Sequence, residues 1–123
     1  MNLDIRHCRV EPGVALFELR GEADAFTAPK LRQAMMDWLD QGTVHFAVDL
    51  SQLAYIDSTN LGVLIGALKR ARERGGDLAI VSPSHRVMRI FEITGLGAIF
   101  PIYDTQEAAL CSFRGNQDGQ PGS

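Results

Sequence analysis

The chain has 123 residues, a length that fits one domain with a single hydrophobic core. Hydrophobic residues make up 46% of the sequence and charged residues 22%, a balance typical of folded globular proteins and not of disordered or fibrous chains. Twelve Lys and Arg against fifteen Asp and Glu give a net charge of −3, and the basic residues form no long block. The charge therefore argues against a nucleic acid as the partner.

The two cysteines, Cys8 and Cys111, lie far apart in the sequence and belong to no CxxC or Cys/His spacing. We expect them to be free thiols in a reducing compartment. The first residues show no basic segment followed by an apolar one, and no apolar run approaches the roughly 18 residues of a membrane span. These features predict a cytoplasmic location and no membrane contact.

The first part of the chain predicts a hairpin, a helix and a third strand. Residues 3–9 and 14–19 are strand-like and flank a Pro-Gly turn signal, which is typical of a β-hairpin. Thr27 is the expected N-cap of an amphipathic helix that ends at Gly42. Residues 44–50 then alternate between apolar and other positions, which predicts a strand with one buried face.

The best-defined predicted element is a helix that begins near Asp57 and Ser58, one of which would cap it. Its core face carries Leu61, Leu64 and Leu68 at helical spacing. The rest of the chain predicts a strand at 78–81, a helix that Ser84 caps and that runs to Gly95, a strand at 99–103 and a helix from an Asp104 cap to Phe113. Helical crossovers between successive strands require a mostly parallel sheet.

These elements predict an α/β fold with a mixed, mostly parallel sheet of four to five strands and helices packed on it. The expected domain covers residues 3–113. Residues 114–123 contain no apolar side chain that could dock on a core, so we expect them to form a disordered C-terminal tail.

Searches for catalytic motifs find no dinucleotide-binding glycine motif, Walker loop, HExxH or nucleophile elbow. The histidines at 7, 45 and 85 are isolated, so we expect no metal, no cofactor and no enzymatic activity. A weaker alternative is that Asp49 and Asp57 form a carboxylate pair for Mg²⁺, as in a receiver domain, although no Lys accompanies them at a known spacing.

Ser58, Gly62 and Gly66 recur every four residues and so lie on one face of the predicted helix, beside its leucine face. We call these three residues the small-residue stripe. Each glycine costs about 1 kcal/mol relative to Ala inside a helix. Either the stripe packs tightly on the protein's own sheet, or it lets another molecule approach the backbone closely.

Four segments, Gly21–Asp24, Asp57–Leu64, Arg72–Gly76 and Phe91–Leu96, together resemble the anti-sigma-factor antagonists of the STAS domain family. The resemblance runs from about residue 3 to residue 112. It implies a bacterial partner-switching protein whose unphosphorylated form binds an anti-sigma factor and releases the sigma factor. The implied partner is a serine kinase with a histidine-kinase-like ATP-binding fold.

The resemblance also implies roles for individual residues. Ser58 would be phosphorylated by the kinase and reset by a PP2C-type phosphatase, and Asp24 would contact the kinase. The implied partner-binding residues are Asp24, Asp57, Ser58, Thr59, Asn60, Gly62 and Gly66. Asn60 stands where the family usually has Gly, which we expect to alter the fit of the partner.

Two alternatives stay open. Many relatives regulate pathways unrelated to sigma factors, such as secretion, biofilm formation or stress complexes. A STAS-like module could also bind a protein or a nucleotide without ever being phosphorylated.

Overall fold

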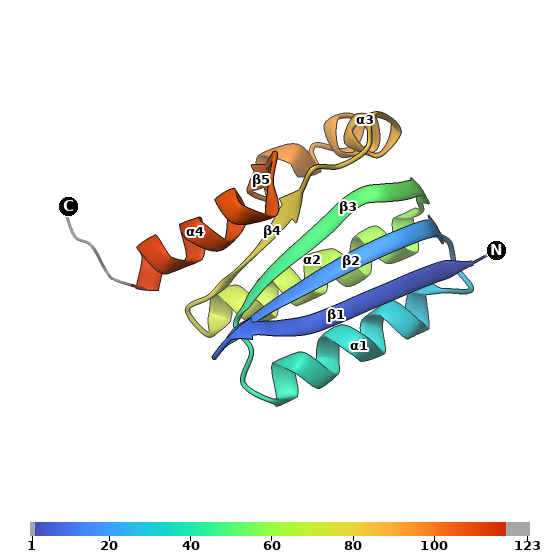
Figure 1. Cartoon of the computed structure of the whole chain (residues 1–123). Helices are drawn as coiled ribbons and strands as arrows, with labels where there is room; N and C mark the ends of the chain where they lie inside the picture. The colour runs from blue at the N-terminus through green and yellow to red at the C-terminus, as the bar shows by residue number, and fades with distance from the viewer. Residues whose placement is uncertain (1, 118–123) are drawn as a thin grey trace.

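The computed structural model describes residues 2–117, with side chains through Arg114 (Figure 1). The elements in chain order are β1 (Leu3–Glu11), β2 (Val14–Ala23), α1 (Ala28–Asp40), β3 (His45–Ile56), α2 (Ser58–Glu73), β4 (Asp77–Val81), α3 (His85–Thr94), the 3₁₀ turn η1 (Leu96–Ala98), β5 (Ile102–Tyr103) and α4 (Gln106–Gln117). The sheet has the order β1-β2-β3-β4-β5. Only the β1–β2 pair is antiparallel, so the predicted α/β class is confirmed.

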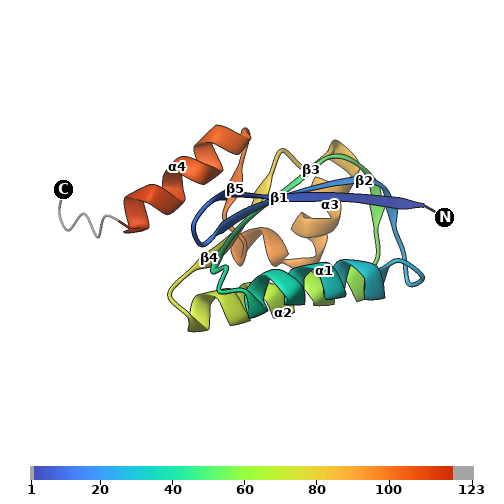
Figure 2. The ribbon, with the colours of Figure 1, turned by 60° about the horizontal axis from the view of Figure 1, so that its bottom comes forward.

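The helices cover the two faces of the sheet unequally. α1 and α2 lie side by side on one face, and α4 lies on the opposite face (Figure 2). The main core joins α1, α2 and α3 to the sheet and includes Leu31, Phe46, Leu64 and Phe91. A smaller cluster joins α4 to the other face through Ala47, Ala79, Ala109 and Phe113.

β3 is buried on both faces near its beginning, which the sequence pattern did not predict. Phe46, Val48 and Leu50 face the main core as expected. Ala47, on the other face, is also fully buried because α4 covers it. A strand that is covered on both sides loses the simple alternation of a half-exposed strand.

Several predicted boundaries differ from the structure. The expected strand at 99–103 is confined to Ile102–Tyr103, because Phe100 turns into the main core after η1. Asp104 does not cap α4; the hydroxyl of Thr105 accepts a hydrogen bond from the Ala108 N–H at 3.1 Å. α4 continues to Gln117, and residues 118–123 of the expected tail lie outside the described residues. Within residues 2–117, no helix has the length and apolar character needed to cross a bilayer.

Candidate functional site

The N-terminus of α2 follows directly on the end of β3, and its cap is Asp57. The Asp57 backbone is extended, and its carboxylate accepts a hydrogen bond from the Asn60 N–H at 3.0 Å. Ser58 is therefore the first helical residue and not the cap. Its side chain is exposed, and its hydroxyl has no hydrogen-bond partner among the described residues. The arrangement leaves the Ser58 hydroxyl accessible to another molecule.

Asn60 connects this helix end to the loop between β2 and α1. Its side-chain amide nitrogen donates to the Asp57 carboxylate and to the Asp24 backbone carbonyl, both at 2.8 Å. Asn60 is fully buried. Asn60 was expected among the partner-binding residues, but its side chain is not exposed to a partner. It instead holds the two segments together, and an altered fit of the partner would arise through them.

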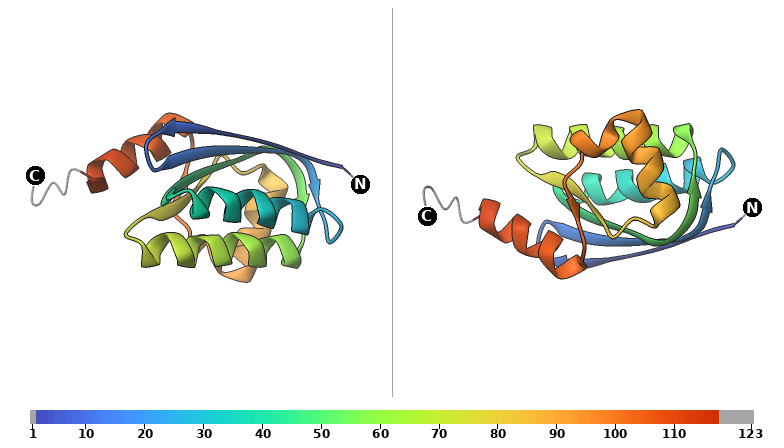
Figure 3. Two further views of the ribbon diagram at one scale, coloured as in Figure 1. Left: turned by 90° about the horizontal axis from the view of Figure 1, so that it is seen from below. Right: turned by 90° about the horizontal axis from the view of Figure 1, so that it is seen from above.

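The loop that carries Asp24 is held by its own hydrogen bonds. The Asp24 carboxylate accepts from the backbone N–H groups of Phe26 at 3.0 Å and Thr27 at 3.1 Å. Thr27 occupies the N-cap position of α1, as predicted, but its hydroxyl donates to the Asp24 carbonyl instead of capping the helix. The Asp57 N–H also donates to the Ala23 carbonyl at 3.0 Å. These bonds place Asp24 and Ser58 at the same end of the sheet. The loop between β2 and α1 and the start of α2 lie at this end (Figure 3).

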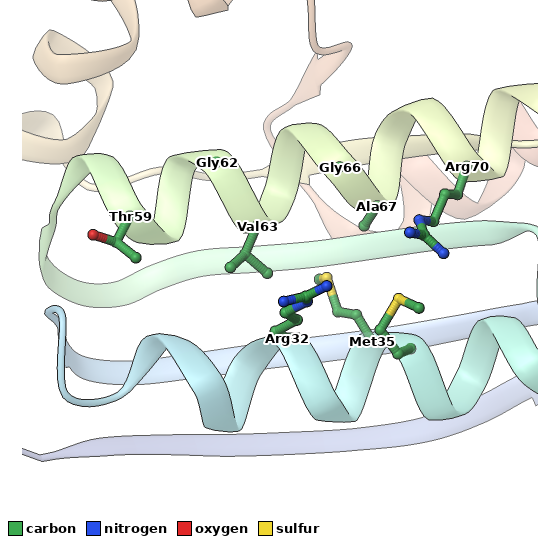
Figure 4. Close-up of a pocket in the computed structure, with 9 residues that line it drawn as sticks. Arg32, Met35, Thr59, Gly62, Val63, Gly66, Ala67 and Arg70 are labelled. Carbon is green, nitrogen blue, oxygen red and sulfur yellow. The ribbon is translucent and has the colours of Figure 1, made fainter.

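The small-residue stripe opens into a groove between α1 and α2. A Cβ added to Gly62 or Gly66 would meet no atom within 4 Å, so neither glycine packs tightly on the sheet. The groove has a volume of about 290 Å³ and is seen between the two helices in Figure 4. It is lined by Arg32, Met35, Met36, Thr59, Gly62, Val63, Gly66, Ala67 and Arg70. This geometry removes the alternative in which the stripe packs on the protein's own sheet.

The structure contradicts a paired-carboxylate metal site at Asp49 and Asp57. The two residues are eight positions apart on an extended strand, which separates them by roughly 26 Å. The Asp49 carboxylate instead accepts from the Ser51 N–H at 2.8 Å and from the Gln106 side chain at 2.7 Å. No group of three or more His, Cys, Asp or Glu in the described part of the chain could hold a metal ion.

The remaining singled-out residues lie away from the site. Cys8 and Cys111 are both exposed free cysteines, as expected. His7 accepts a hydrogen bond from the Trp38 indole at 3.0 Å, and His45 is buried against Phe113 with its ring 4.8 Å away. Each of these histidines thus has a structural setting of its own.

Sequence reasoning did not single out Phe26, which follows Asp24 by two positions. Its side chain is 90% exposed, an unusual state for a phenylalanine. The residues around Phe26 show no apolar periodicity, so the sequence does not indicate which way its side chain points. Its exposure is therefore known only from the structure.

Comparison with known proteins identifies the family. The STAS domain family model matches residues 7–109, so the chain belongs to the STAS domain family. The chain is 41% identical over 86 residues to the anti-sigma-B factor antagonist of Listeria monocytogenes, covering 70% of this chain and 75% of the relative. It is 36% identical over 92 residues to the anti-sigma-B factor antagonist of Bacillus subtilis, covering 75% and 84% of the two chains. Both relatives are named as antagonists of an anti-sigma-B factor.

Solved structures share the fold. The anti-sigma factor antagonist SpoIIAA in its unphosphorylated form superimposes with a TM-score of 0.82 at 23% identity, covering 91% of this chain and 97% of that one. The Bacillus SpoIIAA in its phosphorylated form gives a TM-score of 0.73 at 21% identity, covering 89% and 98%. At such identities the likeness concerns the fold alone.

Proposed function

We propose that this chain is an anti-sigma factor antagonist that works by partner switching. In this proposal its unphosphorylated form binds an anti-sigma factor, a serine kinase with a histidine-kinase-like ATP-binding fold, and so releases the sigma factor. The kinase then phosphorylates Ser58, which ends the binding, and a PP2C-type phosphatase restores the free hydroxyl. The names of the relatives in Listeria and Bacillus support the general role.

The observation that carries the proposal is the setting of the Ser58 hydroxyl. It is exposed at the first helical position, and the adjacent Asp57 already caps the helix. A kinase can therefore reach Ser58 without breaking a hydrogen bond that the fold needs. Thr59 is also exposed, but it lies within the first turn and its branched side chain has less rotational freedom.

A phosphate at Ser58 would be tolerated by the isolated chain. It would bring about −1.5 to −2 charges to the N-terminus of α2, where the helix dipole and the free N–H groups favour an anion. The Asp57 carboxylate beside it opposes this effect in part. We therefore expect a phosphorylated chain that keeps its fold.

At a partner surface the same phosphate would act differently. Ser58 heads the small-residue stripe, where bare backbone at Gly62 and Gly66 allows a close approach. The phosphate adds bulk at this point and adds negative charge next to Asp57. Burying an unpaired charge is costly, so binding would weaken without a large change in shape.

The test is reconstitution with the anti-sigma factor kinase of the same organism and ATP. Binding is measured by calorimetry with and without ATP, and the modified residue is located by digestion and mass spectrometry. We expect tight binding of the unmodified chain, phosphate on Ser58, and recovery of binding after treatment with a PP2C-type phosphatase. Phosphate on Thr59, or binding that phosphorylation leaves unchanged, would contradict the proposal.

A further inference from the structure

Phe26 is the most exposed large apolar side chain in the described part of the protein. Its exposure is 90%, compared with 77% for Ile93 and 45% for Ile99. Single exposed apolar residues are common on protein surfaces. Phe26 differs from them because the backbone beneath it is fixed and because it borders the proposed binding site.

The backbone of the Phe26 loop is held in one conformation. The Phe26 N–H donates to the Asp24 carboxylate, and the Thr27 and Ala28 N–H groups donate to the Asp24 carbonyl, each at 3.1 Å or less. The buried Asn60 amide donates to the same carbonyl at 2.8 Å. A loop backbone that is already ordered loses little further conformational entropy when a partner covers its aromatic ring.

The surface beside Phe26 is hollow and is lined by both apolar and polar side chains. A groove of about 620 Å³ begins at the same loop and continues between α1 and α2. Its lining combines the apolar Ala28, Pro29 and Met36 with the polar side chains of Arg32, Gln33 and Asp40. Thr59 and Val63 line both this groove and the groove along the small-residue stripe, so the two hollows adjoin each other.

We propose that Phe26 is the apolar anchor through which the chain binds the anti-sigma factor, an inference that rests on the proposed function. The ring inserts into an apolar pocket of that partner. The carboxylates of Asp24 and Asp57 give this end of the sheet a negative charge, so we expect cationic or N–H donor groups around that pocket. Aromatic side chains buried at the centre of an interface carry much of its binding free energy.

In this proposal one residue provides binding affinity and another provides its regulation. Phe26 supplies contact area that phosphorylation does not alter, and Ser58 supplies the group that changes. The two residues are held in a fixed relation by Asn60, which bonds both Asp24 and Asp57. A phosphate on Ser58 therefore acts on a partner that is already positioned by Phe26.

The test compares Phe26→Ala, Phe26→Tyr and Ile99→Ala in binding to the anti-sigma factor kinase of the same organism. Ile99 is a matched control, because its carbonyl accepts from Arg72 near the far end of α2, about 20 Å from Ser58. We expect Phe26→Ala to weaken binding by at least about tenfold, while Phe26→Tyr and Ile99→Ala stay within about threefold of wild type. Thermal melts of the free variants should match that of wild type for both changes at Phe26.

Kinetics of Ser58 phosphorylation give a second readout. Loss of an anchor should raise the KM of the kinase for Phe26→Ala and leave kcat nearly unchanged, because the ring does not touch the reacting groups. Equal binding of Phe26→Ala and wild type would overturn the anchor and leave the proposed function intact. If the wild-type chain itself fails to bind the kinase, both the proposed function and the role of Phe26 as an anchor are contradicted.

Discussion

The side chain of Asn60 reaches 36 positions back along the chain and donates a hydrogen bond to the carbonyl of Asp24 at 2.8 Å. The same amide nitrogen donates to the carboxylate of Asp57. The N-terminus of α2 and the loop after β2 therefore form one hydrogen-bonded unit. The relative placement of Asp24 and Ser58 depends on a residue that no partner can touch.

Replacing Asn60 by Ala should lower both stability and partner affinity. The change removes two hydrogen bonds from a buried side chain, which costs about 1–3 kcal/mol in the free energy of unfolding. Thermal or urea unfolding measures this loss. The control is Thr59→Ala at the neighbouring exposed position, expected to change stability by no more than about 0.5 kcal/mol. Equal stability of Asn60→Ala and wild type would show that the bridge between the two segments is not important.

Ser58→Ala should keep both the fold and partner binding, because the hydroxyl makes no hydrogen bond within the described chain. Its effect on the free energy of unfolding should stay within about 0.5 kcal/mol. Ser58→Asp should remain folded, since an acidic residue suits a helix N-terminus, and should bind the kinase more weakly. Calorimetric titration with the kinase measures both variants. If Ser58→Ala abolished binding while circular dichroism stayed unchanged, the hydroxyl would be a direct contact.

Asp57→Ala should be clearly more destabilising than Ser58→Ala. Asp57 is the cap of α2, and its carboxylate accepts from both the backbone and the side chain of Asn60. Loss of a cap costs about 1 kcal/mol, and the freed Asn60 amide adds to that cost. Parallel denaturation curves of the two variants check the ranking. If Ser58→Ala were more destabilising than Asp57→Ala, Ser58 and not Asp57 would be the cap of α2.

The sequence was sufficient to predict features that depend on neighbouring residues, such as strands, the buried face of a helix and helix caps. The alternation of apolar residues over 44–50 located the first part of β3, and the leucine spacing located the buried face of α2. Ser84 was correctly expected to cap α3. The sequence left both Asp57 and Ser58 as possible caps of α2. The hydrogen bond from the Asn60 N–H to the Asp57 carboxylate shows that Asp57 is the cap. Local patterns of this kind follow from residues within one turn or one strand.

Long-range contacts were beyond the reach of the sequence. Asn60 was expected to be one of the partner-binding residues. Its burial and its bond to Asp24 could not be predicted, because they depend on how β2 and β3 pair. The burial of Ala47 depends on α4, which begins about sixty residues later in the chain. The exposure of Phe26 depends on a loop conformation that its own residues build. The burial of Asn60 and of Ala47 therefore requires the assembled sheet, whereas the exposure of Phe26 requires the hydrogen-bonded loop.

Stability should fall as the pH drops below about 6.5, through the titration of His45. Burial lowers the pKa of His45 below its usual value, and the carboxylates of Asp77 and Glu11 only partly oppose this effect. Below the pKa of His45 in the unfolded chain, the unfolded chain therefore binds a proton that the folded chain excludes. The contribution of neutral His45 to stability is complete above that pKa and is lost as the pH falls below it. Unfolding curves at pH 7.5 and 5.5 should differ less for His45→Gln than for wild type. An identical difference in both would exclude His45 as the titrating group.

Substitutions in the small-residue stripe should affect the stability of the free chain and its binding to the kinase in different ways. Gly66 is half-buried in the groove, yet a Cβ there meets no atom within 4 Å, so Gly66→Ala should raise the free energy of unfolding by about 0.5–1 kcal/mol. Gly66→Leu should keep or raise the melting temperature for the same reason. Its larger side chain should weaken kinase binding by holding the two surfaces apart. A lower melting temperature together with lost binding would make Gly66 a packing glycine, and unchanged binding would remove the stripe from the interface.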